Sequence, residues 1–127
     1  MDGMKDSPLR EKSMDFAVRI MALAKALREE RKEYAVADQV LRSGTAIGAN
    51  LAEAAFAPTL RDFLNKCKIA LKECSETRYW LDLFSRAALF PDARLAPLRT
   101  DCNDLLKMLS STCKTVESRL RREQSEK

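Results

Sequence analysis

The feature that most constrains the fold is a long apolar stripe between Thr59 and Ala88. Its members alternate in steps of four and three residues, the spacing that places side chains on one face of an α-helix. We therefore predict one helix over residues 59–88, with Thr59 as its N-cap and Asp62 in a capping-box position. The stripe consists of Phe63, Cys67, Ala70, Cys74, Thr77, Leu81 and Phe84.

Three other segments show the same helical spacing of apolar residues. The first runs from an N-cap at Ser13 to the charged residues 28–33, the second spans 35–55, and the last begins within 92–97. No glycine or proline separates the first two segments, so the periodicity also allows one longer helix across 31–34. Their apolar members are, in chain order, Phe16, Ile20, Leu23 and Leu27; Val36, Val40, Gly44, Ile47 and Leu51; and Leu95, Leu98, Cys102, Leu105, Leu109, Cys113, Val116 and Leu120.

Four helices with short connections predict an all-α fold, an antiparallel up-and-down four-helix bundle over residues 13–122. The 127 residues include only 3 glycines and 4 prolines, too few for the many turns of an all-β fold. We expect residues 1–12 to form a flexible N-terminal lead, a segment that precedes the bundle. We expect the charged residues 123–127 to form a frayed C-terminal tail. Pro97 fits the first turn of the last helix better than its interior. The third and fourth helices are expected to be about half again as long as the first two.

The residue types present exclude several kinds of site. The chain has no histidine, which removes catalytic triads, bases and metal sites built on imidazole. No segment reaches the roughly 18 apolar residues of a transmembrane helix, and the first residues lack a signal-peptide core, so we expect a cytoplasmic protein without membrane contact. The cysteines form no CxxC pair, so we expect buried core thiols and no metal or other cofactor at Cys67, Cys74, Cys102 and Cys113.

Two glycines, Gly44 and Gly48, lie about one turn apart inside the second predicted helix. A glycine in an exposed helix interior costs about 1 kcal/mol relative to alanine. We expect the close approach of another helix to offset this cost at both positions.

A polar stripe flanks the apolar face of the second helix, and glutamates flank that of the third. This seam is either a polar site centred on Asn50 and Glu53, or a structural network that satisfies backbone groups and pairs acids with bases. We favour the structural interpretation, with Arg42 and Arg78 as partners of the glutamates. The seam consists of Gln39, Arg42, Ser43, Asn50, Glu53, Glu73, Glu76 and Arg78.

The third helix carries more apolar residues than one bundle core needs. Such an excess suggests a surface for self-association, although a simply wide core face would give the same pattern. The candidate oligomer contacts are Leu60, Leu64, Ile69, Trp80 and Leu83.

Basic side chains recur on the backs of the third and fourth helices. They are candidates for phosphate contacts, the alternative being an ordinary solvated face. No aromatic residue is expected between them, so the pattern does not predict stacking on bases. The net charge of +4 is only mildly basic. The candidate phosphate contacts are Arg61, Lys68, Lys72, Lys107, Lys114 and Arg121.

Two blocks of the sequence resemble a known family. The stretch 41–54, LRSGTAIGANLAEA, and the block 62–81 are similar to the 23S rRNA intervening-sequence protein family, also called four-helix-bundle proteins. The resemblance covers the second and third helices closely and the other two by pattern. One departure is Ala46, where the family often has serine.

This resemblance implies an up-and-down bundle that assembles as a homopentamer around a central channel, with no established enzymatic activity. It also implies structural roles for Asn50, Glu53, Glu73 and Glu76. The related accessory variability determinant proteins of diversity-generating retroelements bind nucleic acid and a reverse transcriptase, and they are more basic than this chain.

Three functions are therefore compared. The first is a non-enzymatic homo-oligomer, pentameric by resemblance, that serves as an accessory or scaffold and contacts RNA or DNA through phosphates. The second is a protein-interaction adaptor without nucleic-acid binding. The third and least favoured is an enzyme that uses Glu53, Glu73 and Glu76 in one open cleft.

Overall fold

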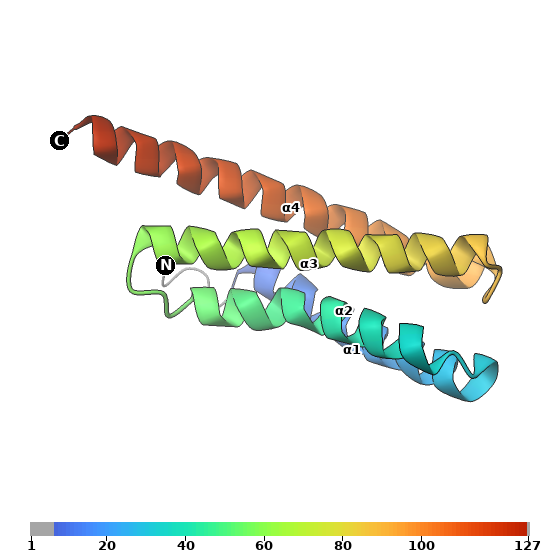
Figure 1. Cartoon of the computed structure of the whole chain (residues 1–127). Coiled ribbons are helices and arrows are strands. Elements are labelled where there is room, and N and C mark those ends of the chain that lie inside the picture. Colours follow the sequence, from blue (N-terminus) through green and yellow to red (C-terminus); the bar gives the residue numbers. More distant parts are fainter. Residues whose placement is uncertain (1–6, 127) are drawn as a thin grey trace.

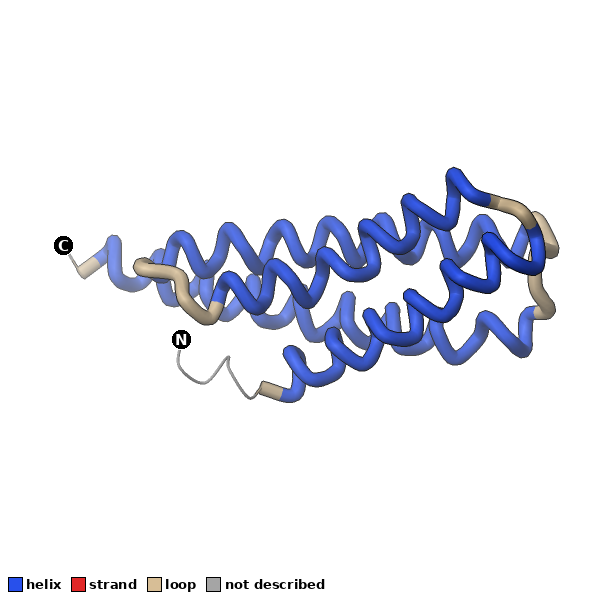
Figure 2. The backbone as a smooth tube through the Cα atoms, turned by 90° about the horizontal axis from the view of Figure 1, so that it is seen from below, coloured by secondary structure: helices blue, strands red, loops and turns tan. Residues whose placement is uncertain are grey.

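The computed structural model describes residues 7–126, and these form four α-helices and no strand (Figures 1 and 2). The expected all-α, four-helix fold is confirmed. Within these residues no helix is long and apolar enough to cross a membrane. The helices are α1 Pro8–Arg31, α2 Tyr34–Ala54, α3 Leu60–Arg86 and α4 Asp92–Ser125.

The first helix begins five residues before the expected cap. Ser7 is the N-cap, its side chain accepts a hydrogen bond from Arg10 N at 3.1 Å, and Pro8 occupies the first helical position. Proline is favoured there because its missing N–H has no partner at a helix start. Ser13 instead lies buried inside α1, and its hydroxyl donates to Arg10 O at 2.8 Å. The prediction of a flexible lead is therefore wrong for residues 8–12, and residues 1–6 lie outside the described range.

The break between α1 and α2 lies at residues 32 and 33. Lys32 adopts a left-handed backbone, with φ at 58°, and Glu33 N donates to Leu27 O at 3.0 Å. This arrangement closes α1 without a glycine, so the two-helix interpretation is confirmed over a single longer helix.

The connections around α3 use the expected cap and one unexpected conformation. Thr59 caps α3, and its side chain accepts from Asp62 N at 3.0 Å. After the end of α3, Ala88 has a positive φ of 54°, and the chain turns into α4.

The last helix differs from expectation at both ends. It begins at Asp92, so Pro97 lies inside the helix rather than in its first turn. It continues through Ser125, so the prediction of a frayed tail is wrong for residues 123–125, which are helical, and Lys127 of that tail lies outside the described range. The 34 residues of α4 make it the longest helix. The 27 residues of α3 exceed the 24 of α1 only slightly, so the expected difference of about half is wrong for that pair.

The helices pack in chain order, with α1 against α2, α2 against α3, α3 against α4, and α4 back against α1. The α1–α2 and α3–α4 connections lie at one end of the molecule and the α2–α3 connection at the other (Figures 1 and 2). The end of α4 extends past the start of α3 (Figure 1). All seven members of the α3 stripe are buried, which confirms it as the core face of this helix.

The four cysteines are buried free thiols between α3 and α4, as expected. The sulfurs of Cys74 and Cys102 lie 3.9 Å apart, and each thiol is 3.5 Å from the other residue's carbonyl oxygen. Burial raises the pKa of the Cys67 thiol to about 12. Protonated thiols in this position act as small core side chains.

Close approach of α1 explains the two helical glycines. A methyl group at Gly44 would lie 2.7 Å from Cγ2 of Ile20, and one at Gly48 would lie 3.3 Å from the Ser13 hydroxyl. The expected close approach of another helix is confirmed at both glycines, and α1 approaches α2 most closely at Gly44. The glycines let α2 lie close enough to α1 for both helices to bury their apolar faces.

Candidate functional site

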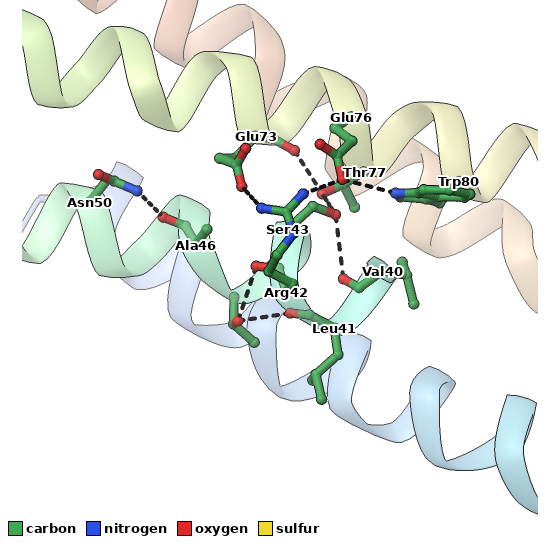
Figure 3. Close-up of polar contacts among 11 residues, drawn as sticks. Val40, Leu41, Arg42, Ser43, Ala46, Asn50, Glu73, Glu76, Thr77 and Trp80 are labelled. Atoms are coloured by element: carbon green, nitrogen blue, oxygen red, sulfur yellow. Dashed lines mark hydrogen bonds and ion pairs between the residues drawn. The ribbon is translucent and has the colours of Figure 1, made fainter. Parts of the chain in front are cut away.

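The polar seam is organised around Arg42, which reaches from α2 to two glutamates of α3 (Figure 3). Its Nη1 lies 2.5 Å from Oε2 of Glu73, and its Nη2 pairs with Glu76. Glu73 is only 5% exposed, whereas the Arg42 side chain is half exposed. The guanidinium therefore neutralises a buried carboxylate from the surface, a geometry that suits a charge-assisted pair.

A neutral hydrogen-bonded layer lies beneath this ion pair. The Thr77 hydroxyl is 2.9 Å from the Ser43 hydroxyl and 2.8 Å from the carbonyl oxygen of Glu73 (Figure 3). Both side chains are fully buried. Within residues 7–126 no buried side-chain nitrogen or oxygen lacks a hydrogen-bond partner. The seam is therefore satisfied internally, as buried polar groups in stable proteins are.

On its outer side the network continues to an aromatic pair. Trp80 Nε1 donates to Oε2 of Glu76 at 3.1 Å. The Tyr79 and Trp80 rings meet edge to face, with centroids 5.1 Å apart and planes at 75°. The hydrogen bond from Trp80 and the pairing with Arg42 hold the pKa of Glu76 below its usual value.

This shift makes the aromatic pair sensitive to acid. Because the folded pKa of Glu76 is lowered, its ionised form stabilises the fold above the ordinary carboxyl pKa, and this stabilisation is lost as pH falls through the folded value. Trp80 is the only tryptophan, so we expect its fluorescence to change below about pH 4.5 in a native-state titration. Glu76→Gln should remove that transition. An unchanged acid transition in Glu76→Gln would contradict this coupling.

Asn50 and Glu53 lie apart from the Arg42 network. Asn50 Nδ2 donates to the carbonyl oxygen of Ala46 at 2.8 Å (Figure 3). Glu53 forms an ion pair with Lys66 at 3.5 Å. The three glutamates of the seam are therefore not brought into one cluster. No group of three potential metal ligands occurs within the described part of the chain.

Two other members of the seam differ from expectation. Arg78 pairs with Asp82, at 3.9 Å, rather than with a glutamate of the seam. Gln39 is exposed and lies outside the network. The expected partnership with the glutamates is confirmed for Arg42 and wrong for Arg78.

The predicted oligomer contacts do not form one exposed surface. Leu64 is 5% exposed and belongs to the core, while Leu60 and Trp80 pack partly buried against it. Leu83 is partly buried, and Ile69 alone counts as exposed. The excess of apolar residues on α3 therefore mostly widens the core face, the alternative that the sequence left open.

A different apolar stripe is exposed, on α1. Met14, Val18 and Met21 are each about three-fifths exposed and follow one another in helical steps of four and three residues. All three residues lie inside the first helix predicted from the sequence, but their spacing alone does not distinguish an exposed apolar stripe from a flank of the core face. Exposed apolar stripes of this kind mark interaction surfaces.

The six candidate phosphate contacts are all at the surface. Lys68 pairs with Glu117 at 3.7 Å, and Arg121 lies 3.4 Å from the hydroxyl of Ser118. The exposed Tyr79 follows Lys72 by seven residues, so an aromatic residue comes after the candidate contacts of α3 rather than between them. Residues seven apart share a helix face.

Comparisons with known proteins agree on one family. The family model described as 23S rRNA-intervening sequence protein matches residues 5–111. The chain is also similar to a crystal structure of a protein of unknown function from the S23 ribosomal protein family of Bacteroides thetaiotaomicron. That protein is 44% identical, with a TM-score of 0.82, and the match covers 84% of this chain and 98% of the other. No curated protein matches the chain. The chain belongs to the 23S rRNA-intervening sequence protein family.

Proposed function

We propose that this chain is a non-enzymatic, homo-oligomeric accessory protein of the cytoplasm that binds RNA or DNA through phosphates. The observation that carries the proposal is a contrast between two sets of cations. Basic side chains between helices, such as Lys12, Arg19 and Arg94, form ion pairs. Five of the six candidate phosphate contacts form none within residues 7–126, namely Arg61, Lys72, Lys107, Lys114 and Arg121.

Cations that form no ion pair keep more of their charge available to a polyanion. Each one that meets a phosphate releases a condensed counterion, which favours binding at low salt. Lys107 and Lys114 border an open surface depression of about 400 Å³, together with Ser110 and Ser111. Hydroxyls beside lysines are common partners of phosphate oxygens.

Self-assembly is supported by the exposed α1 stripe. Three large apolar side chains on one helix face are costly in water and are covered when copies associate. Successive helix connections lie at opposite ends of the molecule, which supports an antiparallel up-and-down arrangement in each copy. The family resemblance supports five copies. Each copy would repeat the cationic surface, which strengthens binding to a long polyanion.

The assembly is tested by introducing a charge into the stripe. Val18→Asp should reduce the mass measured by light scattering from a multiple of 14.4 kDa to that of one chain, because a carboxylate cannot be buried without a partner. Thr100→Asp, on the exposed surface of α4, should leave the mass unchanged. Equal masses for wild type and Val18→Asp would show that this stripe is not the contact.

The phosphate surface is tested by charge reversal. In binding to labelled RNA, Lys114→Glu should weaken affinity and make the salt dependence shallower by about one phosphate contact. Lys25→Glu, an exposed lysine of α1, makes the same change in net charge and should have a much smaller effect. Equal losses in the two variants would indicate a general charge effect and no phosphate surface on α4.

The arrangement of the carboxylates supports a non-enzymatic role. Glu73 and Glu76 share one guanidinium, and Glu53 pairs separately with Lys66. A pair of carboxylates working in acid–base catalysis has to be open to a substrate and set to different pKa values. In this seam Glu73 and Glu76 are instead both paired with Arg42.

A second candidate is a protein-interaction adaptor, favoured by an apolar pocket at the α2–α3 connection. It has a volume of about 890 Å³, with Phe56, Pro58 and Ile69 in its lining. Within residues 7–126, Phe56 is the most exposed of the large hydrophobic residues. In this case charge reversal at Lys114 would leave function intact, whereas Phe56→Ser would abolish partner binding.

A further inference from the structure

The outer face of α3 carries no acidic residue over its whole length. Eight positions share this face, since an ideal helix drifts by only about 20° in every seven residues. The face extends for about 37 Å at a rise of 1.5 Å per residue. Its residues are Arg61, Asn65, Lys68, Lys72, Ser75, Tyr79, Leu83 and Arg86.

Tyr79 is the one aromatic side chain on this face, and it is 58% exposed. Its ring rests edge to face on Trp80, which is partly buried against the core. Trp80 in turn donates to Glu76, which pairs with Arg42 of α2. The exposed Tyr79 ring is therefore held in place by its contact with Trp80, which is itself hydrogen-bonded to the polar seam.

Cations flank the ring along the helix. Lys72 and Arg86 lie seven residues before and after Tyr79, and neither forms an ion pair within the described part of the chain. The exposed Lys68, one turn beyond Lys72, pairs with the partly buried Glu117 at 3.7 Å, a surface pair that a phosphate can replace. An exposed aromatic ring between unpaired cations is the arrangement of proteins that bind single strands.

We propose that the outer face of α3 binds single-stranded nucleic acid, with an unpaired base stacked on Tyr79 and the flanking phosphates on Lys72 and Arg86. This inference rests on the proposed function and narrows it to a substrate class. A base within a duplex is already stacked on its neighbours, so it cannot use the ring, whereas every unpaired base offers a free π-face. The cations alone would not distinguish a single strand from a duplex.

Fluorescence anisotropy with a labelled 20-nucleotide single-stranded RNA and a 20-base-pair DNA duplex tests the proposal. Tyr79→Ala should weaken binding to the single strand by about tenfold or more and leave duplex binding nearly unchanged. Tyr79→Phe keeps the ring and should bind like wild type. Tyr34→Ala removes another exposed tyrosine, at the start of α2, and is the matched control.

The salt dependence separates stacking from charge. Tyr79→Ala should keep the wild-type slope of affinity against salt, whereas Lys72→Gln should reduce the slope on both ligands. The melting temperature of Tyr79→Ala, read by circular dichroism, should match that of wild type, since the ring is exposed.

Three outcomes would overturn the inference. Wild-type affinity of Tyr79→Ala for the single strand would refute stacking and leave the proposed function standing. Equal losses on single strand and duplex would show that Tyr79 does not select unpaired bases. Absence of binding to either ligand at low salt would refute the proposed function as well, and would favour an acidic protein segment as the partner of this face.

Discussion

Replacing Gly44 with leucine is expected to lower the free energy of unfolding by about 3 kcal/mol or more. A Cβ atom at this position alone would lie 2.7 Å from Cγ2 and 3.1 Å from Cβ of Ile20. Ile20 is fully buried and branched at Cβ, so it cannot rotate away from the new side chain. The two helices would have to separate, which exposes the apolar faces between α1 and α2. Thermal or urea unfolding followed by circular dichroism measures the loss.

Alanine at the two glycines gives a matched comparison. At Gly48 the nearest atom to a new Cβ is the Ser13 hydroxyl at 3.3 Å, and alanine gains about 1 kcal/mol of helix propensity over glycine. Gly48→Ala should therefore be close to neutral, whereas Gly44→Ala should be destabilising. If Gly44→Leu melted like the wild-type protein, the close approach of α1 at that position would be wrong.

Replacing Arg42 with methionine is expected to cost about 2 kcal/mol of stability. The variant leaves the carboxylate of Glu73 buried without its counter-ion, and removing one partner of a fully buried pair costs roughly 3–5 kcal/mol. The effect is smaller here because Arg42 is half exposed and water can replace part of the guanidinium. Urea denaturation at neutral pH gives the free energy directly.

Two companion variants identify the source of that cost. Arg78→Met removes an arginine whose partner, Asp82, lies at the surface 3.9 Å away, so it should change stability by less than about 0.5 kcal/mol. Adding Glu73→Gln to Arg42→Met should recover part of the loss, because a neutral amide is less costly to bury than a carboxylate. A double variant no more stable than Arg42→Met would assign the loss to packing of the arginine stem.

Much of the fold follows from local spacing. The stripe on α3 predicted seven of the nine buried positions of this helix, all but Leu64 and Glu73, and Thr59 was correctly predicted as its cap. These signals are local, because a helix face and a cap depend on residues a few positions apart. The paired glycines also predicted the close approach between α1 and α2.

The errors at helix ends have a common cause. Ser13 was predicted as the N-cap of the first helix and Pro97 as a residue of the first turn of the last, but α1 begins at Pro8 and Pro97 lies within α4. Lys32 ends α1 in a left-handed conformation that the sequence does not signal, since glycine is the usual residue there. In each case the packing of the whole helix outweighed a local preference.

The candidate site was less predictable because its contacts are long-range. The partners of Arg42 lie 31 and 34 residues away, and spacing within one helix does not specify the register between two helices. Burial was also ambiguous: Leu64 and Ile69 both extend the apolar pattern of α3, yet only Ile69 is exposed. The exposed α1 stripe was ambiguous in the same way, because Met14, Val18 and Met21 lie inside the predicted first helix and only their exposure shows that they face solvent.

The most direct test of the central claim is binding of the purified wild-type protein to labelled RNA and DNA over a salt series from 50 to about 200 mM. We predict binding at low salt and a linear fall of the logarithm of affinity with the logarithm of salt concentration, at roughly 0.7 to 0.9 per phosphate contact and several contacts in total. No binding at the lowest salt, or binding independent of salt, would contradict the account.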